Sequence, residues 1–173
     1  MNVPLLRALS QQLISPQLNK PEEVVSWMGA MQAQDFGMAK KAIALRMNSR
    51  ASNLLSRVDK ALNDAKIIRA HVMRPTWQIV SAEDYRWMMD LSKDSNERLV
   101  GGYLKAMGVQ ISENEYEKAL EIMESGLSGG KTMQPKELSK LFEGSDLKAD
   151  YHHMIGYLWR AETKKLICSG SIS

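Results

Sequence analysis

Cysteine is almost absent from this sequence, since Cys168 is the single cysteine among 173 residues. One cysteine excludes an intrachain disulfide framework and any zinc site built from several cysteines. No apolar run approaches the ~18 residues that a membrane-spanning helix needs. The first residues, MNVPLLRALSQQL, are too polar for a secretory signal peptide. These absences predict a cytoplasmic protein without a membrane segment.

Motifs for several kinds of chemistry are also missing. The sequence contains no phosphate-binding glycine loop, no nucleophile elbow and no paired-carboxylate motif. The adjacent histidines His152 and His153 point in different directions on a helix and lack a third ligand, so we expect no metal site there. The sequence therefore predicts no metal and no cofactor.

The charged residues are distributed unevenly along the chain. The formal net charge is +3, but residues 36–80 carry +7 and residues 81–128 carry −5. Such asymmetry is expected when one surface faces a polyanion. Chance clustering on a solvated face would produce the same pattern, so charge alone leaves both interpretations open.

Apolar residues recur at helical spacing through most of the chain. The expected helices cover residues 4–14, 21–31, 35–45, 53–63, 81 onward, 96–106, 112–126, 135–142 and 147–163. Asp35 and Ser112 are expected to cap the helices that follow them. The composition, with 44% hydrophobic and 25% charged residues, is that of a globular protein.

One stretch has the composition of β-strands and not of helices. Residues 66–80 are rich in β-branched side chains and are interrupted by Arg74 and Pro75, which predicts strands at 67–72 and 76–80 joined by a turn. Several helices followed by a basic hairpin are typical of a winged helix-turn-helix domain. Residues 132–168 repeat the beginning of this order, with one expected strand at 166–168.

The fold class predicted from these patterns is mainly α with a small β-hairpin (α+β), arranged as a tandem winged helix-turn-helix. The expected division is a first winged-helix domain at 1–80, a helical connector at 81–128, and the start of a second winged-helix domain at 129–173. No room remains for a second hairpin, so the second unit is expected to be incomplete.

Four stretches carry a resemblance to a known family: MGAMQAQD at 28–35, AIALR at 42–46, RAHVMRPTW at 69–77, and the segment 160–170. In this order they resemble the bacterial winged helix DNA-binding proteins that include the AlkZ-type alkylpurine DNA glycosylases. The resemblance covers essentially the whole chain. Family members are usually about twice as long, and the portion that completes their DNA-binding channel has no counterpart here.

The resemblance implies a function in DNA repair. Glycosylases of this family excise alkylated purines and use a glutamine–apolar–glutamine motif, which Gln32, Ala33 and Gln34 match. A glutamine amide cannot act as a general base, but it can orient a water molecule. Orienting the water is sufficient for hydrolysis when the leaving base already carries a positive charge. From the residues alone, Gln32 and Gln34 could equally satisfy backbone groups at a helix junction.

Double-stranded DNA, alkylated if the protein is an enzyme, is the partner that this interpretation requires. The candidate DNA-binding residues are Lys40, Lys41, Arg46, Arg69, His71 and Arg74, with Arg50 and Arg57 as further phosphate-facing charges. His71 is also explained as a packed histidine, and Trp77 as a core residue.

Two alternatives stay open. One is a non-enzymatic DNA-binding module or transcriptional regulator in which the glutamines are structural. The other is a degenerate fragment that exposes apolar surface where a second wing would pack.

Overall fold

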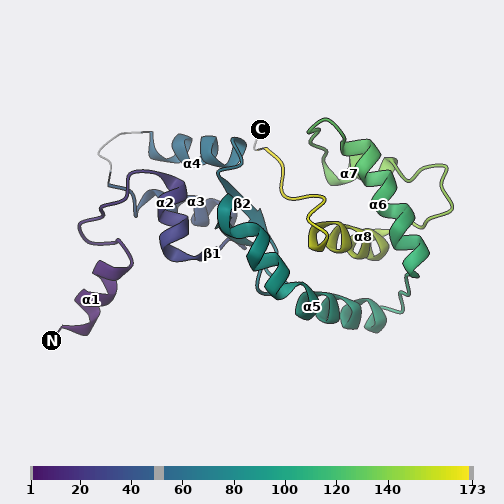
Figure 1. Ribbon diagram of the computed structural model, residues 1–173, viewed down its shortest axis with the longest axis horizontal. Coiled ribbons are helices and arrows are strands. Elements are labelled where there is room, and N and C mark those ends of the chain that lie inside the picture. Colours follow the sequence, from purple (N-terminus) through teal and green to yellow (C-terminus); the bar gives the residue numbers. More distant parts are fainter. Residues whose placement is uncertain (1, 49–52, 172–173) are drawn as a thin grey trace. The chain divides into compact units, whose positions relative to one another are not determined.

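The computed structural model describes residues 2–48 and 53–171 (Figure 1). The chain divides into two compact units. The first contains the residues up to Val72 together with Thr76–Trp87, and the second contains Met73–Pro75 and Met88–Gly170. The division into segments 1–80, 81–128 and 129–173 stays a prediction.

The first unit contains a short sheet and the helices packed on it. Its elements are α1 (Val3–Ser10), α2 (Pro21–Met28), β1 (Ala30–Gln32), α3 (Phe36–Ala44), α4 (Leu54–Asn63), β2 (Ile67–Ala70), β3 (Gln78–Ser81) and the start of α5 (Ala82–Ala106). Helix α2 begins at a proline, whose fixed φ suits a first turn. Its first turn is closed by Glu23, which accepts hydrogen bonds from the Asn19 and Lys20 N–H groups.

The sheet has three antiparallel strands in the order β1-β3-β2. In β3, Gln78 lies opposite Gln32 of β1 on one side and opposite Ala70 of β2 on the other. The hairpin of β2 and β3 was expected, whereas β1 was predicted as the end of a helix. All four residues of the central strand are buried. Helices α2, α3 and α4 complete this core.

The predicted α+β class is confirmed, because helices predominate and the described residues form a single small antiparallel sheet. The predicted hairpin strands were too long, since the paired residues end at Ala70 and begin again at Gln78. The separate helix predicted at 96–106 was wrong, because α5 runs unbroken from Ala82 to Ala106. Asn96 resembles a helix start in the sequence, but it is fully buried within α5.

Helices are the only regular secondary structure among the described residues of the second unit. It holds most of α5 together with α6 (Glu113–Leu127), α7 (Pro135–Lys140) and α8 (Tyr151–Thr163). The expected capping box at Ser112 is confirmed: the Ser112 N–H donates to Glu115 Oε2 at 2.8 Å, and the Glu115 N–H donates to Ser112 Oγ at 3.3 Å.

The strand predicted at 166–168 is not formed. Lys165 adopts a left-handed conformation with φ 61° directly after α8. Leu166 and Ile167 then pack against the helical core as partly buried residues. An isolated extended segment needs a pairing strand to satisfy its backbone groups, and the described part of this unit provides none.

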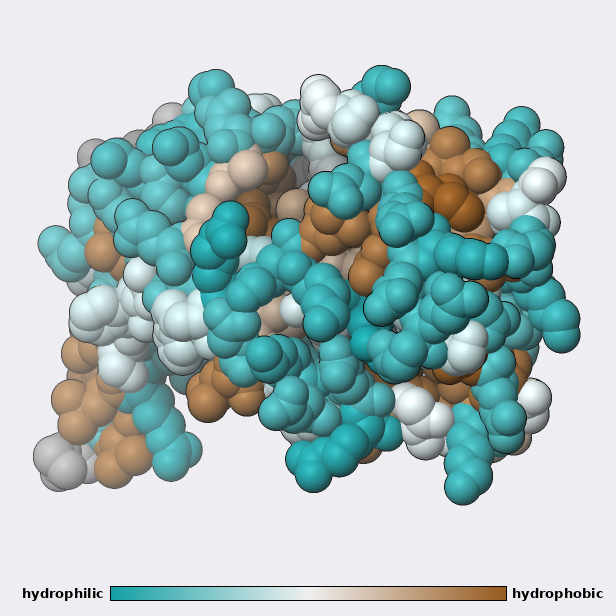
Figure 2. Space-filling view, turned by 45° about the vertical axis from the view of Figure 1, so that its right-hand side comes forward, coloured by the Kyte–Doolittle hydropathy of each residue, from teal (hydrophilic) through white to brown (hydrophobic). Residues whose placement is uncertain are grey.

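Helix α1 exposes most of its apolar side chains. Leu5, Leu6 and Leu9 each remain 40–45% exposed, and no residue of α1 is buried. The apolar patch at the lower left of Figure 2 is this helix, whereas hydrophilic residues cover most of the rest of the face shown. None of the helices in the described part of the chain is long and apolar enough to cross a membrane.

Tyr157 is the largest fully buried side chain of the molecule as described. Its ring stacks on Phe142 with 5.4 Å between ring centroids. Within the described residues its hydroxyl has no hydrogen-bond partner. Burial raises the pKa of Tyr157 to about 12. The neutral phenol is therefore the form that the folded state retains.

Replacing Tyr157 by phenylalanine is expected to stabilise the protein by about 1 kcal/mol at pH 8, because the buried and unpaired hydroxyl is removed. The phenol's pKa is higher in the folded than in the unfolded state. Its contribution to stability is therefore complete below the unfolded value near 10 and is lost as the pH rises toward 12. Urea unfolding between pH 8 and 11.5 should show a steeper alkaline decline for the wild type than for Tyr157→Phe.

Tyr151→Phe is the matched control, because Tyr151 is 73% exposed. It should leave both the stability at pH 8 and the alkaline decline unchanged. A Tyr157→Phe protein that is less stable than the wild type at pH 8 would show that the hydroxyl is satisfied in solution.

Candidate active site

The glutamine motif begins at Gln32, the last residue of β1, and continues through Ala33 and Gln34 into the connection that leads to α3. Met31 and Ala33 are buried, whereas Gln32 and Gln34 are exposed. This alternation is that of an extended chain, in which residues i and i+2 point to the same side. The two glutamine side chains therefore share one side of the segment. The sequence predicted a helix junction here, and the structure makes its first part an edge strand.

The backbone around the motif is bonded to the chain near Trp77. The Ala33 N–H donates to the Trp77 carbonyl oxygen at 2.8 Å, which extends the pairing of β1 with β3 by one residue. The Trp77 N–H donates to Gln34 Oε1 at 3.3 Å. Gln34 thus satisfies a backbone group, as the structural interpretation of the motif expected. A glutamine amide has two acceptor and two donor positions, so this bond occupies one of four.

A third glutamine belongs to the same site and was missed in the sequence. Gln78 lies directly opposite Gln32 in the sheet register, and residues paired in this way project from the same face. It is 5% exposed, and its Nε2 donates to Thr76 Oγ1 at 3.1 Å. Its position directly after Trp77 carried no periodic signal that could have revealed it.

Arg69 lies beneath the motif and does not project freely into solvent. Its Nε and Nη2 donate to the Ala33 carbonyl oxygen at 3.2 and 3.0 Å. The guanidinium carbon is 4.1 Å from the ring centroid of Trp77 and 5.0 Å from that of Phe36. The imidazole of His71 packs on the same Trp77 ring, with 3.7 Å between the two ring centroids. The structure therefore brings Arg69 and His71 together around Trp77.

The remaining predicted DNA-binding residues differ in whether their charged groups are paired within the protein or exposed. Lys40 Nζ forms an ion pair with Asp59 at 2.7 Å. Arg46, two residues after the end of α3, donates through Nη1 to the Ala42 carbonyl oxygen at 2.8 Å. The side chains of Lys41, on α3, and Arg74, in the connection between β2 and β3, are exposed.

Arg50 and Arg57 are the two further candidates for phosphate contacts. Arg50 lies outside the described residues. The side chain of Arg57 donates to the Asn19 carbonyl oxygen at 2.6 Å.

Asp35 starts the helix that follows the motif. Its Oδ1 accepts a hydrogen bond from the Met38 N–H at 3.0 Å, so the predicted N-cap is confirmed. The cap fixes the direction in which α3 leaves the motif. It also brings Phe36, the first residue of α3, against the Arg69 guanidinium.

Carboxylates and histidines do not gather at this site. Across residues 2–48 and 53–171, no group of three or more His, Cys, Asp or Glu side chains is placed to hold a metal ion. The two adjacent histidines have different partners. His152 Nδ1 lies 3.2 Å from the Tyr103 hydroxyl, and His153 Nδ1 lies 2.7 Å from Asp150 Oδ2.

A family model matches most of this chain. The family model described as DNA glycosylase AlkZ-like matches residues 25–169, a range that includes the glutamine motif and the hairpin. The curated proteins include no match to this chain.

A solved structure shares the fold. It is the DNA glycosylase AlkZ of Streptomyces sahachiroi, with a TM-score of 0.66 and 19% sequence identity. The similarity covers 94% of this chain but 43% of that one, so the chain spans less than half the length of its structural relative. The match of the family model to most of the sequence places this chain in the AlkZ-like DNA glycosylase family.

Proposed function

We propose that this protein binds double-stranded DNA and hydrolyses the N-glycosidic bond of alkylated purines, with Gln32 and Gln34 orienting the attacking water. One observation carries the proposal: Gln32 and Gln34 are exposed on either side of the fully buried Ala33, an alternation that directs both glutamines to the same side of the chain. Membership of the AlkZ-like family supports the reaction class.

The chemistry needs little more than orientation from these residues. A purine alkylated at N7 carries a positive charge, so the bond to C1′ breaks with the base leaving as a neutral product. Water must then reach the face of C1′ opposite the leaving base, where its oxygen bonds to C1′ and its proton passes to the solvent, because a glutamine amide does not act as a base. An amide oxygen can accept a hydrogen bond from this water, and an amide N–H can donate one to a neighbouring oxygen. Fixed dipoles of this kind stabilise the transition state without reorganising.

We assign DNA binding to a winged-helix arrangement in the first unit. Helices α3 and α4 precede the hairpin of β2 and β3, which is the element order of such domains. Lys41, the exposed cation on α3, is the side chain of this unit that we expect to contact phosphates. Arg74, exposed in the connection between β2 and β3, is a separate candidate, because that connection belongs to the second unit. Lys40 is less available because of its ion pair with Asp59.

Base release from duplex DNA that contains N7-methylguanine tests the enzymatic proposal. Gln32→Ala and Gln34→Ala are each expected to slow release by about 100-fold, the loss typical of one orienting dipole at a reacting centre. Affinity for the duplex should not change, because neither substitution removes a charge. Gln110→Ala, which removes an exposed glutamine of the second unit, is the matched control and should release base at the wild-type rate.

The same experiment separates the enzyme from a non-enzymatic DNA-binding module. A module would bind duplex DNA with a steep salt dependence and release no base, and both glutamine variants would bind as the wild type does. Release that is unchanged in Gln32→Ala and Gln34→Ala would reject the motif as the source of catalysis.

A further inference from the structure

We propose that Arg69 is a positioning residue that fixes the backbone between Gln32 and Gln34, and that it is not a phosphate contact. The proposal rests on the function assigned above to the two glutamines, and it identifies what holds them in place. The sequence grouped Arg69 with the DNA-binding cations because it lies beside the hairpin turn. Its contacts separate it from that group.

The guanidinium donates to one carbonyl group through two nitrogens. Nε and Nη2 of Arg69 lie 3.2 and 3.0 Å from the oxygen of Ala33, the residue between the two glutamines. Hydrogen bonds from an ionised donor are stronger than those between neutral groups, and the planar guanidinium presents its donors in a fixed geometry. A lysine could supply the charge but not two donors in this fixed planar arrangement.

Two aromatic rings restrict the guanidinium. Its central carbon lies 4.1 Å from the ring centroid of Trp77 and 5.0 Å from that of Phe36. Cation–π contacts at these distances favour the charged group in a half-buried position. Phe36 is the first residue of α3, and Trp77 immediately precedes β3, so Arg69 also links the helix that follows the motif to the start of the strand that pairs with β1.

The backbone of Ala33 is consequently held at both of its polar groups. Its N–H donates to the Trp77 carbonyl oxygen at 2.8 Å, and its carbonyl oxygen accepts from Arg69. Because the glutamines flank this residue, the directions of their side chains depend on both bonds. Holding the reacting groups in advance is how an enzyme avoids the entropic cost of arranging them in the transition state.

Hydrogen exchange and DNA binding together test this role in the full chain. Arg69→Met keeps the aliphatic stem and removes the donors. It is expected to speed exchange of the Ala33 amide by about tenfold or more, since hydrogen bonds to a charged group are lost. The exchange of β3 amides and the melting temperature should change little. The rate of base release should fall, while the affinity for duplex DNA stays the same.

Two further variants control for charge and for position. Arg69→Lys keeps the charge but lacks the paired donors of the guanidinium. The Ala33 amide should therefore exchange as fast in Arg69→Lys as in Arg69→Met. Arg74→Met removes an exposed cation of the hairpin connection. It should leave exchange at Ala33 unchanged and should flatten the dependence of log K on log salt by about 0.9, the value expected for one lost phosphate contact.

The outcomes distinguish this proposal from the proposed function. Unchanged exchange at Ala33 in Arg69→Met, or a salt slope flattened as in Arg74→Met, would overturn the positioning role. Faster exchange confined to the motif with an unchanged salt slope would support it. If the wild type releases no base, the proposed function fails, and exchange at Ala33 still decides whether Arg69 holds the segment.

Discussion

Replacing Ile79 by alanine is expected to lower the free energy of unfolding by about 2–5 kcal/mol, the usual cost of a large-to-small change in a packed core. Ile79 is fully buried in β3, the central strand of the sheet. It pairs with Met31 of β1 on one side and with Arg69 of β2 on the other. The cavity would therefore open between the strand that leads into the glutamine motif and the strand that carries the positioning arginine.

Urea unfolding followed by circular dichroism measures this loss. Ile79→Val is the graded control, and it should cost about 0.5–1.5 kcal/mol because it removes a single methyl group. Ile68→Ala should cost less than Ile79→Ala, because Ile68 of β2 is only partly buried. A loss below 1 kcal/mol for Ile79→Ala would mean that the sheet is not the centre of the first core.

The features that the sequence predicted correctly are those specified by neighbouring residues. The cap of Asp35 on the Met38 N–H and the capping box of Ser112 with Glu115 each join residues three apart. A capping hydrogen bond at this spacing depends on the local helix start and not on distant parts of the chain. The glutamine motif was also recognised from adjacent residues, and its role in catalysis stays a prediction.

The features that the sequence did not reveal depend on distant partners. Strand β1 has three residues, too few to show a period, and it forms because β3 pairs with it. Arg69 reaches the carbonyl of Ala33 across 36 positions of the sequence. The helix expected to begin at Asn96 is part of the continuous α5, in which Asn96 is fully buried. In each case tertiary contacts decided between conformations that the local sequence allowed.

These long-range contacts also explain why two interpretations of the glutamines were left open. Gln34 accepts the Trp77 N–H, which is a structural role, yet both glutamines stay exposed on one side of the segment. The structural bond and an orienting role are compatible, because an amide has positions left after one bond. The anchoring of Gln34 is thus part of what would make it a fixed dipole.

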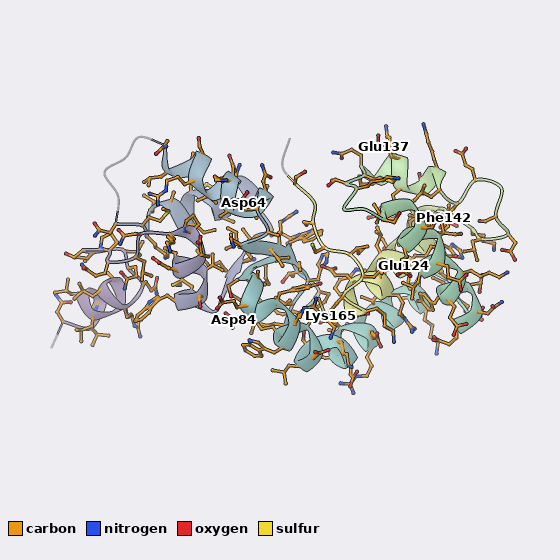
Figure 3. The ribbon with its side chains drawn as sticks, turned by 45° about the horizontal axis from the view of Figure 1, so that its top comes forward. Asp64, Asp84, Glu124, Glu137, Phe142 and Lys165 are labelled. Atoms are coloured by element: carbon orange, nitrogen blue, oxygen red, sulfur yellow. The ribbon has the colours of Figure 1, made fainter. Side chains whose placement is uncertain are left out.

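Replacing Phe142 by alanine is expected to destabilise the second unit by about 3–5 kcal/mol. Phe142, labelled in Figure 3, is 2% exposed and lies two residues after the end of α7. Its ring stacks on Tyr157 of α8 with an interplanar angle of 7°. With six residues, α7 is too short to be stable alone, so it depends on such contacts. The loss should appear in urea unfolding monitored by tryptophan fluorescence.

Two comparisons identify the cause of that loss. Phe142→Leu retains most of the buried volume and should cost less than Phe142→Ala, because the remaining cavity is smaller. Truncating Leu138, the buried residue of α7, should weaken the same attachment, since both side chains belong to one core with Tyr157. If Phe142→Ala costs less than 1 kcal/mol, α7 must be held by contacts other than this ring. If Phe142→Leu costs as much as Phe142→Ala, stacking on Tyr157 contributes more than the volume that the phenyl ring fills.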